Sequence, residues 1–173
     1  MKVYIANLDS IGKISDTKLS DDEILQYNKF SNQTRRNQYL MAHAIIFDKT
    51  CEHPISDKNG KLHLQNGFVS VAHKDNWVVV ALSGQNVGID IENASIKRDF
   101  ISESELLGIK PTNDAEFFYK NFTQYESDVK YGDESETANH LFYKLGNYMI
   151  CVCTNDSNVE FICVDCDVQI LPL

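Results

Sequence analysis

Three short apolar segments follow one another in the middle of the chain, and they constrain the fold more than any other feature. They are residues 68–72, 77–82 and 87–92, and each is rich in β-branched or other apolar side chains. Turn-forming residues, Ser83-Gly84-Gln85-Asn86, separate the second segment from the third. Short runs of this kind, bounded by turn residues, are typical of antiparallel strands. The sequence therefore predicts a β-meander over residues 68–92.

Helix signals precede this meander. Ser20 and Glu23 form a capping-box pattern, which predicts a helix that ends near residue 30. Apolar residues at helical spacing predict a second, longer helix over residues 32–49. A strand is expected before both helices, at residues 2–7, and residues 50–67 are expected to be irregular.

A similar order follows the meander. Ser102 and Glu105 predict a short helix, and residues 114–131 are expected to form a longer one. Apolar segments then predict strands at residues 141–144, 148–154 and 159–170.

This order of elements favours an α+β fold with two related halves, each with a long helix packed on an antiparallel meander. The chain has 173 residues, of which 43% are hydrophobic, enough to form one packed interior. We therefore expect residues 1–173 to form a single compact unit. Its N-terminal half would comprise residues 1–67 and its C-terminal half residues 68–173.

The net charge of −9 is unevenly distributed along the chain. Basic and acidic residues balance in residues 1–100, so the acidic excess lies in residues 101–173. Because nucleic-acid binding requires a basic face, we expect no nucleic acid as a partner. No apolar run approaches the roughly 20 residues that span a bilayer. We expect no membrane association and a cytoplasmic location.

Four of the five cysteines lie near the C-terminal end: Cys151, Cys153, Cys163 and Cys166. Their spacing, Cys-x-Cys followed by Cys-x-x-Cys, suits four thiolates around a zinc ion. The alternative is that Cys151 and Cys153 pack as small hydrophobic side chains within an apolar strand. A metal-binding module built on the four thiols is therefore one functional hypothesis.

Asp90 and Glu92 stand two residues apart in the third strand of the predicted meander. Side chains at positions i and i+2 of a strand project from the same face. The two carboxylates are therefore expected to point together, while Ile89 and Ile91 face the core. Mg²⁺ prefers such oxygen ligands and keeps positions open for phosphate and water. The alternative is the ordinary alternation of a solvated strand edge.

Two further features carry functional groups. Glu126 and Lys130 are separated by four residues, so they share one face of the predicted long helix. Taken alone, they would form a surface ion pair. His73 ends the first strand of the meander, where a histidine either caps the strand at the surface or donates a hydrogen bond to a phosphate.

Together these features resemble the 4′-phosphopantetheinyl transferases. That family carries a strand ending in a Ser-His-like motif, then a Gly-Ile-Asp-x-Glu segment, then a helix with a Lys-Glu-[Ser/Ala]-x-x-Lys signature. Residues 70–73, 88–92 and 122–130 present related motifs in the same order and at similar spacing. Gly60-Lys61 is similar to a Gly-Lys-Pro segment of the family, and residues 36–46 are similar to its long N-terminal helix.

The resemblance covers about residues 20–132, and it implies a transferase-like fold with two related halves in a monomeric chain. It implies the transfer of 4′-phosphopantetheine from coenzyme A to a serine of an acyl or peptidyl carrier protein, with Mg²⁺ as cofactor. Asp90, Glu92 and Glu126 would hold the Mg²⁺. The carrier would dock on the less acidic N-terminal half.

The resemblance also assigns the remaining roles. Lys130 would neutralise or protonate the departing 3′,5′-ADP, and Glu126, or a water that it orients, would take the proton of the carrier serine. His73 would contact the 3′-phosphate region of coenzyme A. Lys61 would contact its phosphates or its adenine pocket.

The chain departs from the family pattern at several positions. Ala72 stands where the family has Ser beside the His, and His43 stands where the long helix commonly has Arg. Tyr125 replaces the Lys of the Lys-Glu pair, and Phe122 replaces a Trp. Each lost charge-assisted hydrogen bond costs about 1.5–3 kcal/mol. An alternative hypothesis is therefore a catalytically impaired paralogue that acts as a partner-binding protein.

Overall fold

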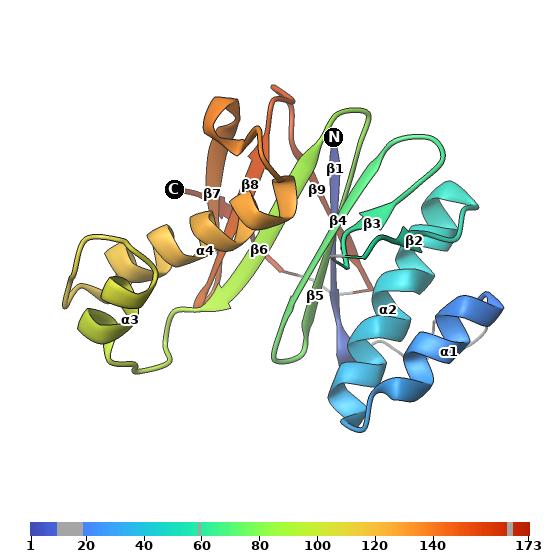
Figure 1. Ribbon diagram of the computed structural model, residues 1–173, viewed down its shortest axis with the longest axis horizontal. Helices are drawn as coiled ribbons and strands as arrows, with labels where there is room; N and C mark the ends of the chain where they lie inside the picture. The colour runs from blue at the N-terminus through green and yellow to red at the C-terminus, as the bar shows by residue number, and fades with distance from the viewer. Residues whose placement is uncertain (10–18, 59, 166–167) are drawn as a thin grey trace.

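The computed structural model describes residues 1–9, 19–58, 60–165 and 168–173. Within these ranges the chain is a mixed α+β protein with four α-helices and two β-sheets, as the sequence predicts (Figure 1). The helices are α1 (Asp21–Lys29), α2 (Gln33–Thr50), α3 (Phe100–Leu106) and α4 (Ala115–Tyr131). None of the described helices is both long and apolar enough to cross a membrane.

The strands form one sheet of six and one of four. From edge to edge the first contains β2 (Ile55–Ser56), β3 (Leu62–His63), β4 (Phe68–Lys74), β5 (Trp77–Ser83), β1 (Lys2–Asn7) and β9 (Glu160–Val164). The second contains β10 (Leu171–Pro172), β7 (Asn139–Leu145), β8 (Tyr148–Thr154) and β6 (Val87–Asn93). Neighbouring strands are antiparallel except for β1 and β9, which are parallel.

The same order of elements occurs twice along the chain. The first set is β1, α1, α2, β4 and β5, and the second is β6, α3, α4, β7 and β8. In each set the last strand pairs with both of the others, so β5 lies between β4 and β1, and β8 lies between β7 and β6. The change from one set to the other falls at the turn between Ser83 and Val87. The expected boundary at residues 67 and 68 lies between β3 and β4, which belong to one sheet.

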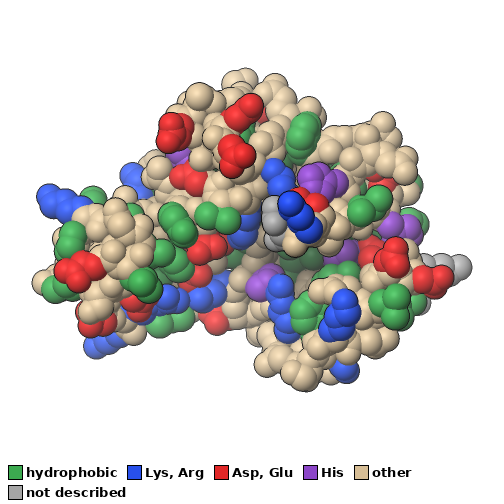
Figure 2. Space-filling view, in the orientation of Figure 1, with side chains coloured by type: hydrophobic (Ala, Val, Ile, Leu, Met, Phe, Trp, Pro, Cys, Tyr) green, Lys and Arg blue, Asp and Glu red, His purple; other side chains and the backbone are tan. Residues whose placement is uncertain are grey.

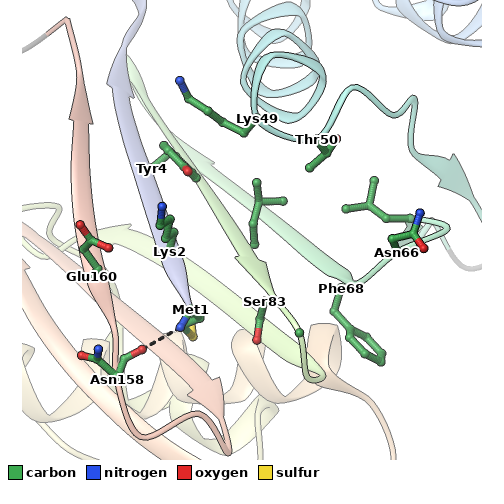
Figure 3. A pocket seen from close by; sticks show the side chains of 13 residues that line it. Met1, Lys2, Tyr4, Lys49, Thr50, Asn66, Phe68, Ser83, Asn158 and Glu160 are labelled. Atoms are coloured by element: carbon green, nitrogen blue, oxygen red, sulfur yellow. Dashed lines mark hydrogen bonds between the residues drawn. The ribbon is translucent and has the colours of Figure 1, made fainter.

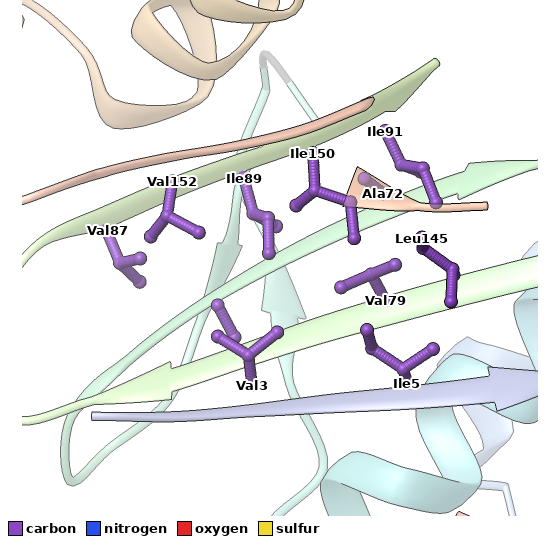
Figure 4. Close-up of a cluster of buried hydrophobic side chains, with 11 residues drawn as sticks. Val3, Ile5, Ala72, Val79, Val87, Ile89, Ile91, Leu145, Ile150 and Val152 are labelled. Carbon is purple, nitrogen blue, oxygen red and sulfur yellow. The ribbon is translucent and has the colours of Figure 1, made fainter. Parts of the chain in front are cut away.

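The main core lies between the two sheets (Figure 4). It is formed by buried side chains that alternate along the strands of both sheets: Val3, Ile5, Ala72, Val79, Ala81, Val87, Ile89, Ile91, Leu145, Ile150 and Val152. Burying one such aliphatic side chain stabilises the fold by roughly 1.5–3 kcal/mol. Because both sheets contribute, this core fixes the position of β6 against β4.

Each sheet has one helix packed on its outer face. The first sheet packs Tyr4, Val78 and Val80 against Met41 and Ile45 of α2. The second sheet packs Met149 of β8 against Phe118 and Tyr119 of α4. The layers are therefore α2, first sheet, second sheet and α4, with α2 and α4 apart in the view (Figure 1).

Several local predictions are confirmed, and others are wrong. Ser20 and Glu23 form the capping box that starts α1. The short helix α3 is capped by Asp99, not by Ser102, so it starts earlier than predicted. Residues 50–67, expected to be irregular, contain the short strands β2 and β3. The last predicted strand, residues 159–170, ends at Val164, because Asp165 has a left-handed φ of 52° that interrupts the strand.

Candidate functional site

β6 presents its carboxylates to α4. Ile89 and Ile91 face the inter-sheet core, so Gly88, Asp90 and Glu92 project from the opposite face. The helix crosses β6 so closely at Gly88 that an added Cβ would overlap the carbonyl oxygen of Ser127 and lie 2.7 Å from the Tyr131 nitrogen. Glycine is thus required at this position for α4 to reach Asp90.

Asp90 forms an ion pair with α4. The Lys130 Nζ lies 2.7 Å from Asp90 Oδ1 and donates a second hydrogen bond, of 2.9 Å, to the Ile89 carbonyl. Only 7% of Asp90 is exposed, so the alternative of a solvated strand edge is wrong for this residue. Its second oxygen, Oδ2, is buried and has no hydrogen-bond partner among the described residues. An unpaired buried carboxylate oxygen is costly, and a bound cation would satisfy it.

Glu92 is also surrounded by positive charge. Its Oε2 lies 2.6 Å from the Lys74 Nζ and 3.6 Å from Arg98, which also pairs with Glu103 at 3.0 Å. Although the contact with Lys74 is close, Oε2 makes no hydrogen bond with suitable angles. The interaction at Glu92 is therefore an ion pair in which the carboxylate still has acceptor capacity.

Glu126 lies within electrostatic range of both carboxylates of β6. Burial raises the pKa of Glu126, the charge of Asp90 raises it further, Lys130 lowers it, and Glu92 raises it. Like charges raise a carboxyl pKa only when they are close and poorly screened. The three predicted metal ligands therefore lie within electrostatic range of one another, but they do not form the described group of three ligating side chains whose ligand atoms all lie within 4.8 Å. Lys130 pairs with Asp90 and not with Glu126, so these two α4 residues do not form the simple surface pair considered above.

His73 lies at the end of β4, in a positively charged environment. Burial lowers its pKa to about 4, and the charges of Arg35, Lys130 and Lys74 contribute to the same shift. The imidazole is therefore neutral at pH 7 and can donate one hydrogen bond. The cations come from α2, α4 and β4, so both sets of elements contribute to this region.

Arg35 is a cation without an acidic partner among the residues that the structure describes. Its guanidinium lies 5.3 Å from the ring centre of Phe30, and burial lowers its pKa. Figure 2 shows basic, acidic and histidine side chains gathered in the middle of one face, between the part with α3 and α4 and the part with α1 and α2. A desolvated cation in such a region is suited to an anionic ligand.

Lys61 makes its hydrogen bonds at the C-terminal end of α4. Its Nζ donates hydrogen bonds of 2.8 Å to the carbonyl of Tyr131, the last residue of α4, and of 3.3 Å to Asn86 Oδ1. A cation at a helix C-terminus interacts favourably with the helix dipole. The contacts of Lys61 therefore give it a structural role at the end of α4, and none of them joins it to His73.

The positions at which the chain departs from the family pattern have structural explanations. Ala72 faces the inter-sheet core, where a hydroxyl would be buried. His43 is buried and binds Glu23 at 2.6 Å. Phe122 stacks on Phe118 with ring centres 5.7 Å apart, whereas Tyr125 is 43% exposed. None of these contacts brings an additional cation to the site.

Three cations of the region were not predicted from the sequence: Arg35, Lys74 and Arg98. Lys74 directly follows His73, and this adjacency is the one sequence signal that points to it. Arg35 lies on α2, which reaches the site only through tertiary packing, and Arg98 lies in the irregular segment between β6 and α3. No spacing along the chain could therefore have identified them.

The predicted four-cysteine zinc site is not assembled by the described cysteines. Cys151 and Cys153 lie in β8 of the second sheet, whereas Cys163 lies in β9 of the first. Among the described residues, the one group of three metal-ligating side chains includes Cys153 but not Cys163. Cys166 lies outside the described residues.

A surface hollow lies away from these charged residues. It has a volume of about 500 Å³ and lies beside the start of β1, the start of β4 and the end of α2 (Figure 3). There the N-terminal nitrogen donates a 2.8 Å hydrogen bond to the Asn158 carbonyl. The side chains that line the hollow include Lys2, Lys49 and Glu160, and none of the candidate site residues. Size alone therefore does not identify the site, and we assign it on chemistry.

No protein-family model matches the chain, and no curated protein matches it.

Proposed function

We propose that the protein is a Mg²⁺-dependent 4′-phosphopantetheinyl transferase with the corresponding two-part fold. The main support is that Asp90 on β6 pairs with Lys130 on α4, and that Glu126, one turn earlier on α4, lies within electrostatic range of Asp90, beside cations from β4 and α2. These residues lie in the motifs that carry the resemblance. The repeated order of elements, with β1, α1, α2, β4 and β5 matching β6, α3, α4, β7 and β8 once the short strands β2 and β3 are set aside, supports the fold assignment.

The carboxylates fit a hard divalent cation. Asp90 Oδ2 is buried and unpartnered, and the pKa of Glu126 is raised by burial and by neighbouring negative charge. Asp90, Glu92 and Glu126 would hold Mg²⁺, which prefers oxygen ligands. When bound, the ion supplies charge neutralisation for the diphosphate of coenzyme A.

The protein's own residues perform the remaining tasks. The carrier serine forms a bond from Oγ to the β-phosphorus of coenzyme A, and the bond from that phosphorus to the bridging oxygen breaks to release 3′,5′-ADP. Glu126, or a water that it orients, accepts the proton of the serine hydroxyl. Lys130 and Arg35 stabilise the departing phosphates by charge, and neutral His73 donates a hydrogen bond.

The test is the loading of apo acyl and peptidyl carrier proteins, measured as a gain in carrier mass with coenzyme A and Mg²⁺. We expect loading by the wild type and none by Asp90→Ala, since the metal would lose a buried ligand. Glu116→Gln is the matched control, because this acid of α4 is exposed and forms its ion pair with Lys144, away from the candidate site. Retention of most activity in Asp90→Ala would contradict the assigned site.

A second candidate function has its own observation. Lys130 and Lys74 already neutralise Asp90 and Glu92, which is the arrangement expected if no metal binds. In that case the protein is a catalytically impaired paralogue that binds a partner protein. Calorimetry with coenzyme A and Mg²⁺ distinguishes the two, because micromolar binding supports the transferase and the absence of binding supports the paralogue.

A further inference from the structure

A second group of metal-ligating side chains lies on the other flank of α4. It consists of Asp128 on α4, His140 on β7 and Cys153 on β8, whose ligand atoms all lie within 4.8 Å of one another. His140 Nε2 is 2.6 Å from Asp128 Oδ1, and Cys153 Sγ is 3.4 Å from the same oxygen. His140 and Cys153 are directly opposite each other in the β7–β8 register.

The position of this group separates it from the proposed transferase site. Asp128 follows Glu126 by two residues, which is about 200° around a helix of 3.6 residues per turn. Lys130 points to β6, whereas Asp128 points to the β7–β8 hairpin. The two groups therefore use opposite flanks of α4, and a ligand in one does not need the other.

The neighbours of Cys151 are those of an ordinary buried thiol, whereas the neighbours of Cys153 are not. Both thiols are buried, and both face α4 from the same strand. Cys151 contacts the hydroxyl of Ser127, which is a neutral group. Cys153 instead contacts a carboxylate that is also bound to an imidazole, so sulfur, oxygen and nitrogen ligands meet at one point. A small hydrophobic side chain has no need of such neighbours.

We propose that Asp128, His140 and Cys153 bind a zinc ion. Zinc accepts sulfur, nitrogen and oxygen ligands at about 2.0–2.3 Å in tetrahedral geometry, which keeps the ligand atoms roughly 3.3–3.7 Å apart. The separation of 3.4 Å between Cys153 and Asp128 already fits this requirement. The pair of Asp128 and His140 must open by about 1 Å, as the ion replaces the proton between them.

The burial of the three side chains determines how a zinc ion would reach them and which coordination position would stay open. The side chains of His140 and Asp128 are 19% and 27% exposed, so an ion reaches the group from solvent, whereas Cys153 is buried behind them. Three protein ligands leave a fourth position for water. The bound ion would fasten α4 to the β7–β8 hairpin and so hold the helix that carries Glu126 and Lys130.

The test uses the full-length protein and two metals. Protein purified without chelators is expected to contain about one zinc per chain by elemental analysis. After zinc removal, titration with Co²⁺ is expected to give a thiolate-to-cobalt charge-transfer band in the near ultraviolet. Cys153→Ser should abolish the band, and Cys151→Ser should keep it, since Cys151 is not part of the group.

A second variant guards against misfolding of Cys153→Ser. His140→Gln changes a partly exposed side chain, and it should eliminate the rise in melting temperature that Zn²⁺ gives the wild type. Absence of bound zinc together with absence of the cobalt band would overturn the proposal, as would a band that persists in Cys153→Ser. These readouts do not depend on transferase activity, so they separate this proposal from the proposed function.

Discussion

At the scale of single residues, the chemistry of the candidate site depends on which charged groups have an oppositely charged neighbour. Lys130 forms an ion pair with one oxygen of Asp90, and the other oxygen is buried without a hydrogen-bond partner in the part of the chain that the structure describes. His73 is the opposite case, a neutral ring held among positive charges. Such a residue responds strongly to a bound anion, because the anion cancels the charges that keep it unprotonated.

The pKa of His73 should therefore report on ligand binding. In the free protein it is expected at about 4, and saturating 3′,5′-ADP should raise it by about one unit or more. Proton NMR titration of the imidazole resonances measures this shift. His63, which is 52% exposed and pairs with Asp57, is the internal control and should not respond. Arg35→Gln should raise the pKa of His73 without any ligand, and an unchanged His73 in both experiments would contradict the assignment.

A buried carboxylate gives a second prediction at the residue scale, on stability. Glu23 is buried, which opposes ionisation, but hydrogen bonds from His43 and from the Ser20 backbone lower its pKa to about 2. A lowered carboxyl pKa contributes stability above the unfolded value of 4.5, and this contribution is lost as the pH falls towards 2. Glu23→Gln should therefore cost on the order of 3 kcal/mol at pH 7.

The difference in unfolding free energy between wild type and Glu23→Gln should shrink as the pH falls from 4.5 to 2. Urea unfolding at a series of pH values measures it. Asp22→Asn, an exposed neighbour in α1, is the control and should change little at any pH. A difference that stays constant across this range would show that Glu23 does not act through its charge.

At the scale of elements, the approach of α4 to β6 depends on one missing side chain. Gly88→Ala would place a Cβ against the Ser127 carbonyl, which is backbone and cannot rotate away. The helix must move, so we expect a loss of about 3 kcal/mol in unfolding free energy, together with a weaker Lys130–Asp90 pair. Gly84→Ala is the matched control, because its Cβ would meet open space. Equal stability of the two variants in urea unfolding would contradict the close crossing.

The sequence predicted elements well where local signals were strong. The capping box at Ser20 and the β4–β5 hairpin of residues 68–83 both rest on interactions between near neighbours in the chain. The prediction of one meander over residues 68–92 is wrong, because β6 pairs with β8 of the second sheet and not with β5. The wrong predictions involve tertiary effects. The strand after residue 159 ends at the left-handed Asp165, and β2 pairs with β3 through only two residues on each strand. Neither feature leaves a periodic pattern in the sequence.

The candidate site shows the same division. Strand and helix periodicity predicted that Asp90 shares a face with Glu92 and that Glu126 shares a face with Lys130, whereas their assignment to one site came from the resemblance. Lys61 was assigned to coenzyme A on resemblance alone, and its contacts are with the end of α4. Arg35 could not be predicted, because it reaches His73 only after α2 packs on the first sheet.

At the scale of the whole molecule, the inter-sheet core joins the two sets of elements. Ile150 of the second sheet is fully buried in it, together with Val79 of the first. If this core holds the protein as one unit, Ile150→Ala should lower the unfolding free energy by about 2–5 kcal/mol. Both sheets should then still unfold in one transition.

Two probes on different sheets make this testable. Trp77, the single tryptophan, lies on β5 of the first sheet, and its fluorescence changes when that strand or its contact with Tyr148 of β8 is lost. Cys151, buried on β8, reports on the second sheet by its reactivity with a thiol reagent, and Cys51→Ser and Cys163→Ser remove more accessible thiols. In urea both probes should give one midpoint, and Ile150→Ala should shift both equally. If the Cys151 thiol reacted before the Trp77 signal changed, the two sheets would be separate units, and a site built from α2, β4, β6 and α4 would not be held in place by the core.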